Sequence, residues 1–459
     1  MKRKIFIGLM AVTCATALAF GIAGCDGNGE KKPNGGNNSN NDPPNYTPPD
    51  AVSSELFEYE LNDDESGYVV TGLAEDTTVS TIIIPSTYNN LPVTAIGERA
   101  FGDCVSLTGV TISSGISIIG SGAFTGCINL PSFRFPSTIT KISDSAFQNC
   151  SGLRALNFNG TSQLEVIEQN AFQNCTSLTG ANIPDSVVTL GDRAFQGCSS
   201  LKSVTIGDSV ETIGVDAFRG CTNLATVTIG NSLKHVAEGA FFRCSKISEM
   251  HFPDTLESVG LGALQECTGL KNLTLPFIGK EKYEVPVPEA EEDSPDNHTN
   301  FGFIFGANSI RDQASLDLNN LETLTITGDS PIGYHAFDSI GSYTNKPQNP
   351  TIGLSKIIIT GNVKVIADGA FQLCYNLNTI VLPKSLTTIG RQILGENIKT
   401  VYYCGSEDDW GKMNVKTNNM YLLGTSEIPD PRYYYSESEP TETGKFWHYV
   451  DGVPTPWNK

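Results

Sequence analysis

Apolar residues recur along most of the chain in one short pattern, which is clearest between residues 194 and 206. This copy begins with Ala-Phe, has a cysteine and a leucine four and seven residues after the alanine, and ends in Val204-Thr205-Ile206. The ending alternates apolar and polar residues as a β-strand does, so Val204 and Ile206 are predicted to face a core and Thr205 to face solvent. The Ala-Phe segment is long enough only for a turn of α-helix or 3₁₀-helix.

Copies of the pattern follow one another at a spacing of 23 residues, or 25 once, and resume after an interruption. Their first residues are Ala100, Ala123, Ala146, Ala171, Ala194, Ala217, Ala240, Ala263, Ala336 and Ala370. A cysteine follows nine of these alanines four residues later, and Ile340 replaces it once. A single copy cannot bury its own apolar face. Stacked copies are therefore predicted to form a parallel sheet, with one strand per repeat, over a continuous core.

The period and the core Leu201-x-x-Val204-x-Ile206 resemble a leucine-rich repeat, and the whole pattern resembles the BspA-like class of bacterial surface proteins. The resemblance covers about residues 56–403. It implies an α/β-type, mostly β solenoid: a right-handed superhelix with one parallel strand per repeat and short helical or 3₁₀ turns. It also implies an extracellular, non-catalytic module for binding protein or glycan, and it names no partner.

A small hydroxyl residue lies three residues after the last apolar position of most strands. These residues are Thr138, Thr161, Ser186, Ser209, Ser232, Thr255 and Ser385. The general leucine-rich consensus has asparagine or cysteine there, so this chain departs from it. We expect a ladder of hydroxyl groups that bond backbone groups exposed by the turns.

The first 24 residues have the composition of a signal peptide. Lys2, Arg3 and Lys4 precede an apolar stretch, 5–22, which ends in Ile-Ala-Gly-Cys at Cys25. This ending resembles a bacterial lipobox, which implies lipid on Cys25 and cleavage before it. The alternatives are an ordinary signal peptide and an uncleaved membrane helix, although the apolar stretch is short for a spanning helix.

The chain is predicted to divide into seven segments, beginning with the signal peptide. They are 1–24, the signal peptide; 25–55, a disordered Pro/Asn/Gly tether; 56–98, an N-terminal cap and first repeat; 99–276, repeats; 277–320, an insertion; 321–403, repeats; and 404–459, an aromatic C-terminal cap. Signal, lipid and tether predict an extracytoplasmic location, with the domain anchored to the cell membrane and exposed at the cell surface.

The formal net charge of −20 argues against nucleic acid and anionic lipid surfaces as partners. Membrane contact is therefore expected only through the lipid on Cys25, and the partner is expected to be an extracellular protein or glycan. The chain is expected to be a monomer.

Nine cysteines occupy one position of the repeat, and we call them the cysteine column. We expect them to be buried free thiols, because residues at one repeat position stack along the core. Neighbouring cysteines would lie about 5 Å apart, so disulfides between turns remain an alternative. A zinc site is disfavoured because such ligands form a line.

No enzyme motif is present. The five histidines lack metal-ligand spacing, and no serine elbow, phosphate loop or dinucleotide fingerprint appears. We expect no catalytic residue, no metal and no cofactor.

The insertion has an acidic middle, 289–296, and an apolar end, 301–306. The apolar end is expected to pack into the core. The acidic part is interpreted as a solvated charge run rather than a calcium loop, because it lacks the spaced ligand pattern of such a loop. The insertion as a whole is either a spacer or a binding loop.

The candidate ligand-binding residues are the outward residues of successive strands, which share the exposed sheet face. They are Arg134, Asn157, Asn182, Thr205, Thr228 and His251. The alternative is an ordinary solvated β-surface, since threonine is common in strands. Further along the chain the outward residues become apolar, at Ile358 and Val381.

All three tryptophans, Trp410, Trp447 and Trp457, lie in the last segment. This segment is either a cap that seals the open sheet edge or an aromatic platform for sugars. Two functions follow: a binding protein for adhesion or recognition, or an envelope protein that holds cell-wall polymer through its C-terminal aromatic residues.

Overall fold

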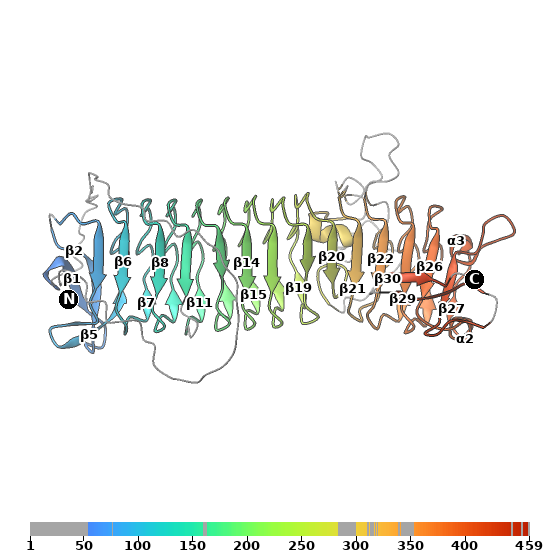
Figure 1. The fold of residues 1–459 in the computed structure, drawn as a ribbon, viewed down its shortest axis with the longest axis horizontal. Coiled ribbons are helices and arrows are strands. Elements are labelled where there is room, and N and C mark those ends of the chain that lie inside the picture. The colour runs from blue at the N-terminus through green and yellow to red at the C-terminus, as the bar shows by residue number, and fades with distance from the viewer. Residues whose placement is uncertain are drawn as a thin grey trace, which may run out of the picture.

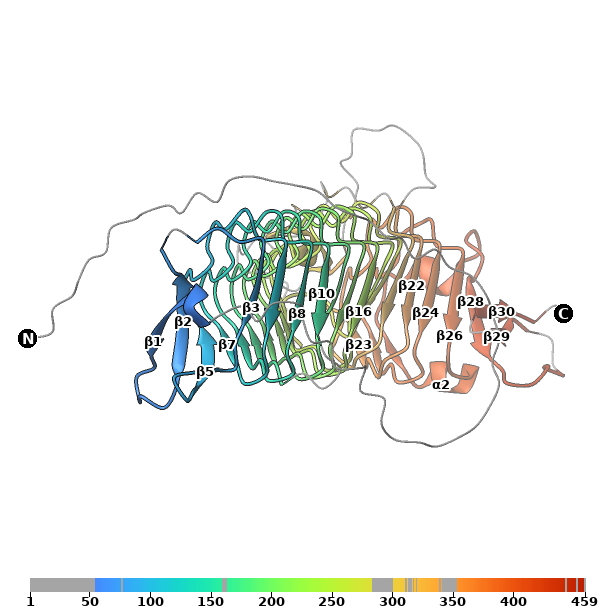
Figure 2. The same ribbon diagram turned by 60° about the vertical axis from the view of Figure 1, so that its left-hand side comes forward.

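The computed structural model describes residues 54–75, 77–158, 163–282, 300–309, 320–337, 353–441, 444–450 and 453–457, and the single positions 312, 316, 318 and 340. The chain winds into an elongated, mostly β solenoid of about 13 turns, as the repeat predicts. Strands of successive turns lie side by side along the body (Figures 1 and 2). The predicted signal peptide, lipidation site and tether up to residue 53 lie outside the described residues.

One strand of each turn contributes to a row that we call the long-strand sheet. Its members are β3 (Thr81–Ile84), β6 (Gly109–Ile112), β8 (Ser132–Phe135), β10 (Ala155–Phe158), β12 (Gly180–Asn182), β14 (Ser203–Ile206), β16 (Thr226–Ile229), β18 (Glu249–His251), β20 (Asn272–Leu275), β21 (Thr323–Ile326), β22 (Lys356–Ile359), β24 (Thr379–Leu382) and β26 (Thr400–Tyr403). Strand pairing is interrupted between β6 and β8 and between β16 and β18. The paired strands of this row are parallel and in register, so Val204 lies beside Val227 and Thr205 beside Thr228. Val204 and Ile206 are buried and Thr205 is exposed, as the alternation predicts.

A second, shorter strand in most turns builds a short-strand sheet. Its members are β7 (Ile118–Ile119), β9 (Lys141–Ile142), β11 (Val166–Ile167), β13 (Thr189–Leu190), β15 (Thr212–Ile213), β17 (His235–Val236), β19 (Ser258–Val259), β23 (Val365–Ile366), β25 (Thr388–Ile389) and β27 (Asn414–Val415). The bend after β15 requires glycine, because a Cβ on Gly214 would lie 2.6 Å from the backbone nitrogen of Asp192.

The Ala-Phe segments form the third side of each turn. They contain the 3₁₀-type bonds that their length predicts, such as Cys198 N–H to Phe195 O at 3.2 Å. Alternate amides instead reach the next turn, as Phe195 N–H does to Ala217 O at 2.8 Å. Arg193 and Gly197 have φ angles of 55° and 73°, which prevent a helix from propagating. Hydrogen bonds therefore join successive turns on all three sides.

Stacked phenylalanine rings run through the centre of the core. The ring centroids of neighbours from Phe101 to Phe241 are 5.1 to 5.5 Å apart, and these rings are fully buried. Leu264 interrupts the stack, which resumes with Phe301, Phe337 and Phe371. Burial of each ring contributes about 1.5–3 kcal/mol to folding.

The cysteines of the column are buried free thiols, as the sequence analysis favoured. Each described thiol after the first turn donates to a phenylalanine carbonyl of the preceding turn, as Cys198 Sγ does to Phe172 O at 3.2 Å. Burial raises the pKa of Cys150, Cys198 and Cys267 from the ordinary value of 9.0 to about 12. These thiols are therefore protonated and unreactive at neutral pH.

The predicted hydroxyl ladder is confirmed at four positions. Thr138, Ser186, Thr255 and Ser385 donate to a backbone carbonyl of the preceding turn at 2.7 to 2.9 Å. Ser209 and Ser232, which are also described, form no such bond, and Thr161 lies outside the described residues.

The apolar end of the insertion packs into the core as predicted. It forms η3 (Phe301–Phe305), all of whose residues are buried. Leu264 N–H donates to Ile304 O at 2.8 Å and Phe301 N–H donates to Ala336 O at 2.8 Å, so η3 occupies the place of an Ala-Phe segment. The acidic residues 289–296 lie outside the described residues.

Each end of the solenoid carries elements that the repeats lack. At the N-terminal end, η1 (Ser54–Leu56), β1 (Phe57–Leu61), β2 (Tyr68–Leu73), β4 (Thr87–Tyr88) and β5 (Leu91–Ile96) close the short-strand sheet. At the C-terminal end lie α2 (Glu407–Gly411), α3 (Met420–Leu423), β28 (Arg432–Tyr435), β29 (Phe446–Val450) and β30 (Val453–Pro456). The long-strand sheet continues through β28 and β29 to β30, whose two prolines cannot donate to a further strand.

The described residues offer no candidate for a membrane span or for a metal site. No helix there is both long and apolar enough to cross a bilayer. Nor do any three histidine, cysteine, aspartate or glutamate side chains in that part of the chain lie together as metal ligands would.

Candidate ligand-binding surface

The six candidate residues form a single row across the outer face of the long-strand sheet, which we call the polar row. Its members, from β8 to β18, are Arg134, Asn157, Asn182, Thr205, Thr228 and His251. Register pairs Arg134 with Asn157 and Asn182 with Thr205, and all six residues are exposed. At a strand spacing of about 4.8 Å the row extends about 24 Å.

A second outward column runs beside the polar row, two residues earlier on each strand. Its members are Ser132, Ala155, Gly180, Ser203, Thr226 and Glu249. Most are small, so the longer side chains of Arg134, Asn157 and His251 stand above a low surface. On the outer face, the longer polar side chains therefore project beyond a column of mostly small residues.

The polar row differs from other polar columns in having no internal partners. Within the described part of the chain, none of the six side chains makes a hydrogen bond or an ion pair with another residue. Donors and acceptors of the guanidinium, amide, hydroxyl and imidazole groups are therefore left for solvent or a ligand.

Polar columns on the other two sides of the solenoid bond to themselves. Gln148, Gln173 and Gln196 form a ladder of amide-to-amide hydrogen bonds along the Ala-Phe side. On the short-strand sheet, Lys141 Nζ lies 2.7 Å from a carboxylate oxygen of Glu168. These columns serve the stacking of turns, whereas the polar row does not.

The C-terminal part of the same outer face is covered rather than open. Its outward residues Ile358, Val381 and Tyr402 lie side by side in register. Val381 is fully buried, because Trp447 of β29 packs over this face with its ring centroid 5.1 Å from that of Tyr402. The Trp447 indole N–H donates to Tyr403 O at 2.9 Å. The apolar outward residues thus belong to a second, smaller core.

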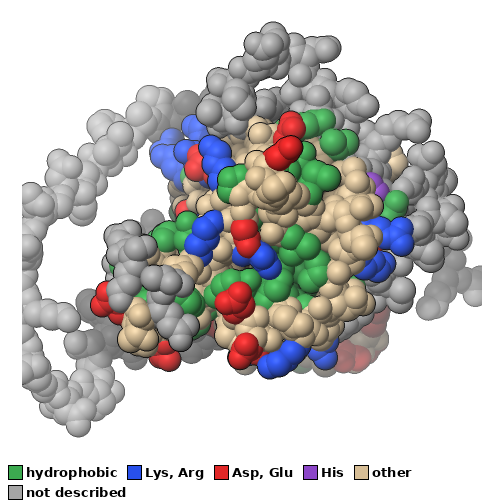
Figure 3. All heavy atoms as spheres, turned by 90° about the vertical axis from the view of Figure 1, so that its right-hand side faces the viewer, with side chains coloured by type: hydrophobic (Ala, Val, Ile, Leu, Met, Phe, Trp, Pro, Cys, Tyr) green, Lys and Arg blue, Asp and Glu red, His purple; other side chains and the backbone are tan. Residues whose placement is uncertain are grey.

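The tryptophans mainly serve this cap. Trp447 is fully buried and Trp410 is 7 % exposed, so neither ring face is open to a sugar. Trp457 is half-buried and stacks on His448 with ring centroids 3.7 Å apart. Figure 3 views this end of the solenoid, where hydrophobic side chains form separate patches among charged side chains and the tan surface of other side chains and backbone. The structure therefore favours the sealing role over the aromatic platform.

The repeats match the family model described as the BspA type leucine rich repeat region, in six copies covering residues 74–202, 165–282 and 340–402. The chain belongs to the BspA-type leucine-rich repeat family. A search of curated proteins found no match.

Several solved leucine-rich repeat structures are similar to this BspA-type chain. A leucine-rich repeat protein of T. pallidum is 29% identical over 48% of this chain and 91% of its own, with a TM-score of 0.40. A leucine-rich repeat protein from Bacteroides ovatus is 24% identical over 79% of this chain and 98% of its own, with a TM-score of 0.48. A leucine rich cell surface protein from Faecalibacterium prausnitzii is 21% identical over 81% and 99%, with a TM-score of 0.38.

Sequence reasoning missed one hollow on the BspA-type solenoid, between the corner at Gln372–Tyr375 and α3. The repeat could have revealed part of it. Leu373 and Tyr375 are exposed at positions where most earlier turns carry glycine, polar or hydroxyl residues. The wall formed by α3 has no counterpart among the repeats, so no spacing argument predicts it.

Proposed function

We propose that this BspA-type chain is a non-catalytic recognition protein that binds an extracellular protein or glycan through the polar row. The observation that carries the proposal is the absence of internal partners for the six side chains, in the part of the chain that the structure describes. The side chains on a buried sheet face are shielded from solvent, and those of the glutamine ladder bond to one another. The polar-row side chains are exposed to solvent and do not bond to one another. A partner that paired these groups would gain hydrogen bonds without displacing internal ones.

The proposed location follows from the N-terminal sequence. Lys2, Arg3 and Lys4, the apolar stretch 5–22 and Cys25 together support export and lipid attachment. The domain would then stand at the cell surface with the polar row accessible to large ligands.

The test is a binding screen of the whole chain against host matrix proteins and glycans, with a fourfold variant beside it. Arg134→Ala, Asn157→Ala, Asn182→Ala and His251→Ala remove four exposed groups and should weaken any authentic ligand at least tenfold, by about 1.4 kcal/mol or more. Equilibrium binding of each ligand found in the screen gives the readout.

The matched control places the same kinds of substitution on the short-strand sheet. Lys141→Ala, Thr189→Ala, Thr212→Ala and His235→Ala change one cation, one imidazole and two small polar groups. This control should bind as the unchanged chain does. Unaltered binding by the polar-row variant, for every ligand detected, would show that the row is ordinary solvated surface.

A second function, attachment to cell-wall polymer, rests on the aromatic residues that the cap leaves accessible. Tyr449 is 42% exposed and Trp457 is half-buried. Removing the whole segment would be a poor test, because it would uncover Val381 and Tyr402. Tyr449→Ala with Trp457→Ala is the appropriate variant: if it abolishes pelleting with purified wall and spares binding to host proteins, the wall-binding function is separate from the polar row.

A further inference from the structure

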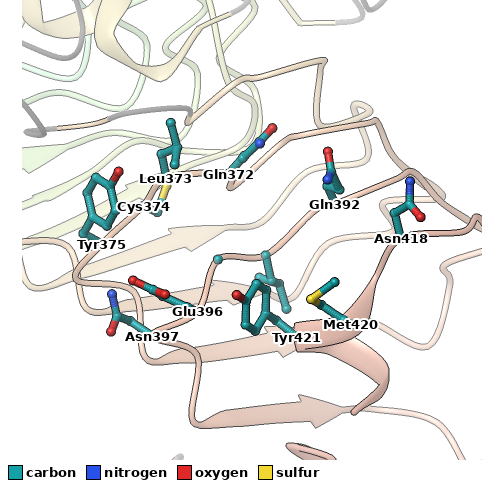
Figure 4. Close-up of a pocket in the computed structure, with 12 residues that line it drawn as sticks. Gln372, Leu373, Cys374, Tyr375, Gln392, Glu396, Asn397, Asn418, Met420 and Tyr421 are labelled. Atoms are coloured by element: carbon teal, nitrogen blue, oxygen red, sulfur yellow. The ribbon is translucent and has the colours of Figure 1, made fainter. Parts of the chain in front are cut away.

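The hollow at the C-terminal shoulder is a small pocket between two successive turns and α3. It has a volume of about 280 Å³ and lies between the corner Gln372–Tyr375, the next turn at Gln392 and Leu394–Asn397, and the residues Asn418, Met420 and Tyr421. In Figure 4, Tyr375 and Asn397 lie toward one end of the pocket and Gln392 and Asn418 toward the other, with Tyr421 and Met420 along one side.

The walls of the pocket are held by buried contacts. Asn419 is 4% exposed, and its amide nitrogen donates to Gly390 O at 2.7 Å. Its side-chain oxygen accepts from Ile393 N–H at 3.1 Å, which ties α3 to the preceding turn. On the opposite wall, Cys374 Sγ donates to Phe337 O at 2.9 Å. The pocket is thus pre-formed by the fold.

Two side chains of the pocket depart from what the repeat places at their positions. Leu373 has a φ angle of 57° and is 40% exposed. The equivalent left-handed positions of earlier turns hold Asp103, Gly126, Asn149, Asn174, Gly197, Gly220, Arg243 and Glu266. An exposed leucine in this conformation serves neither the turn nor the core.

Tyr375 departs from the repeat in the same way. It is 46% exposed, and six earlier turns carry serine or threonine at this position, at Ser151, Thr176, Ser199, Thr222, Ser245 and Thr268. Only the first two turns have apolar residues there, Val105 and Ile128. Since six earlier turns fold with a small hydroxyl residue at this corner, the fold does not require a ring there. The exposed ring of Tyr375 is therefore available for contact with a ligand.

The remaining lining is rich in amides. Gln372, Gln392, Asn397 and Asn418 each offer both donors and acceptors, and Glu396 is the single charged residue. Hydroxyl groups also donate and accept, so a neutral polyhydroxylated ligand matches this lining. The aromatic and aliphatic side chains, Tyr375, Tyr421, Leu373 and Met420, suit the C–H faces of a sugar ring.

Other ligand classes fit less well. An anionic group would meet Glu396 without a cation among the lining residues. Peptide recognition ordinarily uses an open sheet edge, an elongated apolar groove or an arginine cluster, and the lining forms none of these. The volume is also at the small end for ligand pockets, which favours one or two compact units.

We propose that this pocket is a carbohydrate subsite that holds one neutral hexose or N-acetylhexosamine unit. Its amides bond the hydroxyl groups, and Tyr375 and Tyr421 cover the apolar faces of the ring. The subsite is separate from the polar row and does not depend on ligand binding there.

The test titrates the whole chain with glucose, galactose, mannose and N-acetylglucosamine, using calorimetry and saturation-transfer NMR. Tetra-alanine serves as the peptide probe. At least one sugar should bind saturably. Leu373→Gly with Tyr375→Ser restores residues that ordinary turns carry, and it should raise the dissociation constant about tenfold, or about 1.4 kcal/mol. Leu373→Gly also relieves a left-handed leucine, so the midpoint of thermal unfolding should not fall.

Ile128→Ser is the matched control, because it changes an exposed apolar residue at the position equivalent to Tyr375 but far from the pocket. It should leave sugar binding unchanged, and so should the polar-row variant. The proposal is overturned if no sugar saturates, if the Leu373/Tyr375 variant binds sugar as the unchanged chain does, or if tetra-alanine displaces the sugar.

Discussion

The column of cysteines illustrates what a repeated residue reveals by itself. Periodicity and the substitution of Ile340 predicted burial, and the described thiols of the column are buried and form no disulfide. The sequence could not indicate that each thiol after the first turn donates to a carbonyl of the preceding turn, because that bond depends on the geometry of the Ala-Phe segment. Cysteine is therefore small enough for the core and also gives the Phe172 carbonyl, which already accepts Cys175 N–H at 3.2 Å, a second hydrogen bond.

Burial of these thiols predicts loss of stability in alkali. Cys150, Cys198 and Cys267 have pKa values raised from 9.0 to about 12, so the folded chain keeps protons that the unfolded chain releases above pH 9.0. The free energy of unfolding should be independent of these thiols below pH 9.0. It should fall as the pH rises from 9.0 toward 12, by about 1.4 kcal/mol per pH unit for each thiol.

Urea unfolding between pH 9.0 and 10.0 measures this slope, below the ordinary pKa of tyrosine, 10.0. Cys198→Ala removes one titrating group and should reduce the slope. An identical slope in that variant, or rapid labelling of the column by a thiol reagent in the folded chain, would contradict the assignment.

At the scale of elements, the strands and the Ala-Phe segments were predictable because each repeats at one spacing. The covering of the C-terminal part of the outer sheet face could not be predicted. Ile358 and Val381 were recognised as apolar and outward, but the residue that buries them, Trp447, lies far along the chain and outside the repeat. A contact of that kind has no periodic signal. The same limitation explains why α3 and the pocket beside it escaped prediction.

Trp447 is the side chain that packs the C-terminal cap against the outer sheet face, over Val381 and Tyr402. Trp447→Ala opens a cavity over Val381 and Tyr402 and removes the indole bond to Tyr403 O. We expect the C-terminal unit to lose about 3–5 kcal/mol of stability, the usual cost of truncating a buried aromatic residue. Far-ultraviolet circular dichroism during urea unfolding should show an earlier first transition.

Trp457→Ala provides the comparison, because it also removes an indole hydrogen bond, to Ser436 O at 3.1 Å, but from a ring that is only half-buried. Its effect should be clearly smaller. If both variants unfold at the same urea concentration, Trp447 does not hold the second core together.

At the scale of the whole molecule, the solenoid is a uniform scaffold with two local departures from uniformity. Its outer sheet face is open and polar from β8 to β18, and covered from β22 onward. The position of the polar row could be predicted, because strand alternation and register determine which side chains share a face. The sequence could not predict whether those side chains have internal partners, since that depends on the lengths and directions of neighbouring side chains.

Three histidines lie on three different surfaces, so one experiment can test whether a ligand binds at the polar row. His251 belongs to the polar row, His235 lies on the short-strand sheet, and His448 lies in the C-terminal cap. Hydroxyl-radical footprinting with mass spectrometry follows the oxidation of each, with and without a ligand found in the screen. We predict that the ligand protects His251 and leaves His235 and His448 equally reactive. Protection of His448 or His235 while His251 stays reactive would contradict recognition through the polar row.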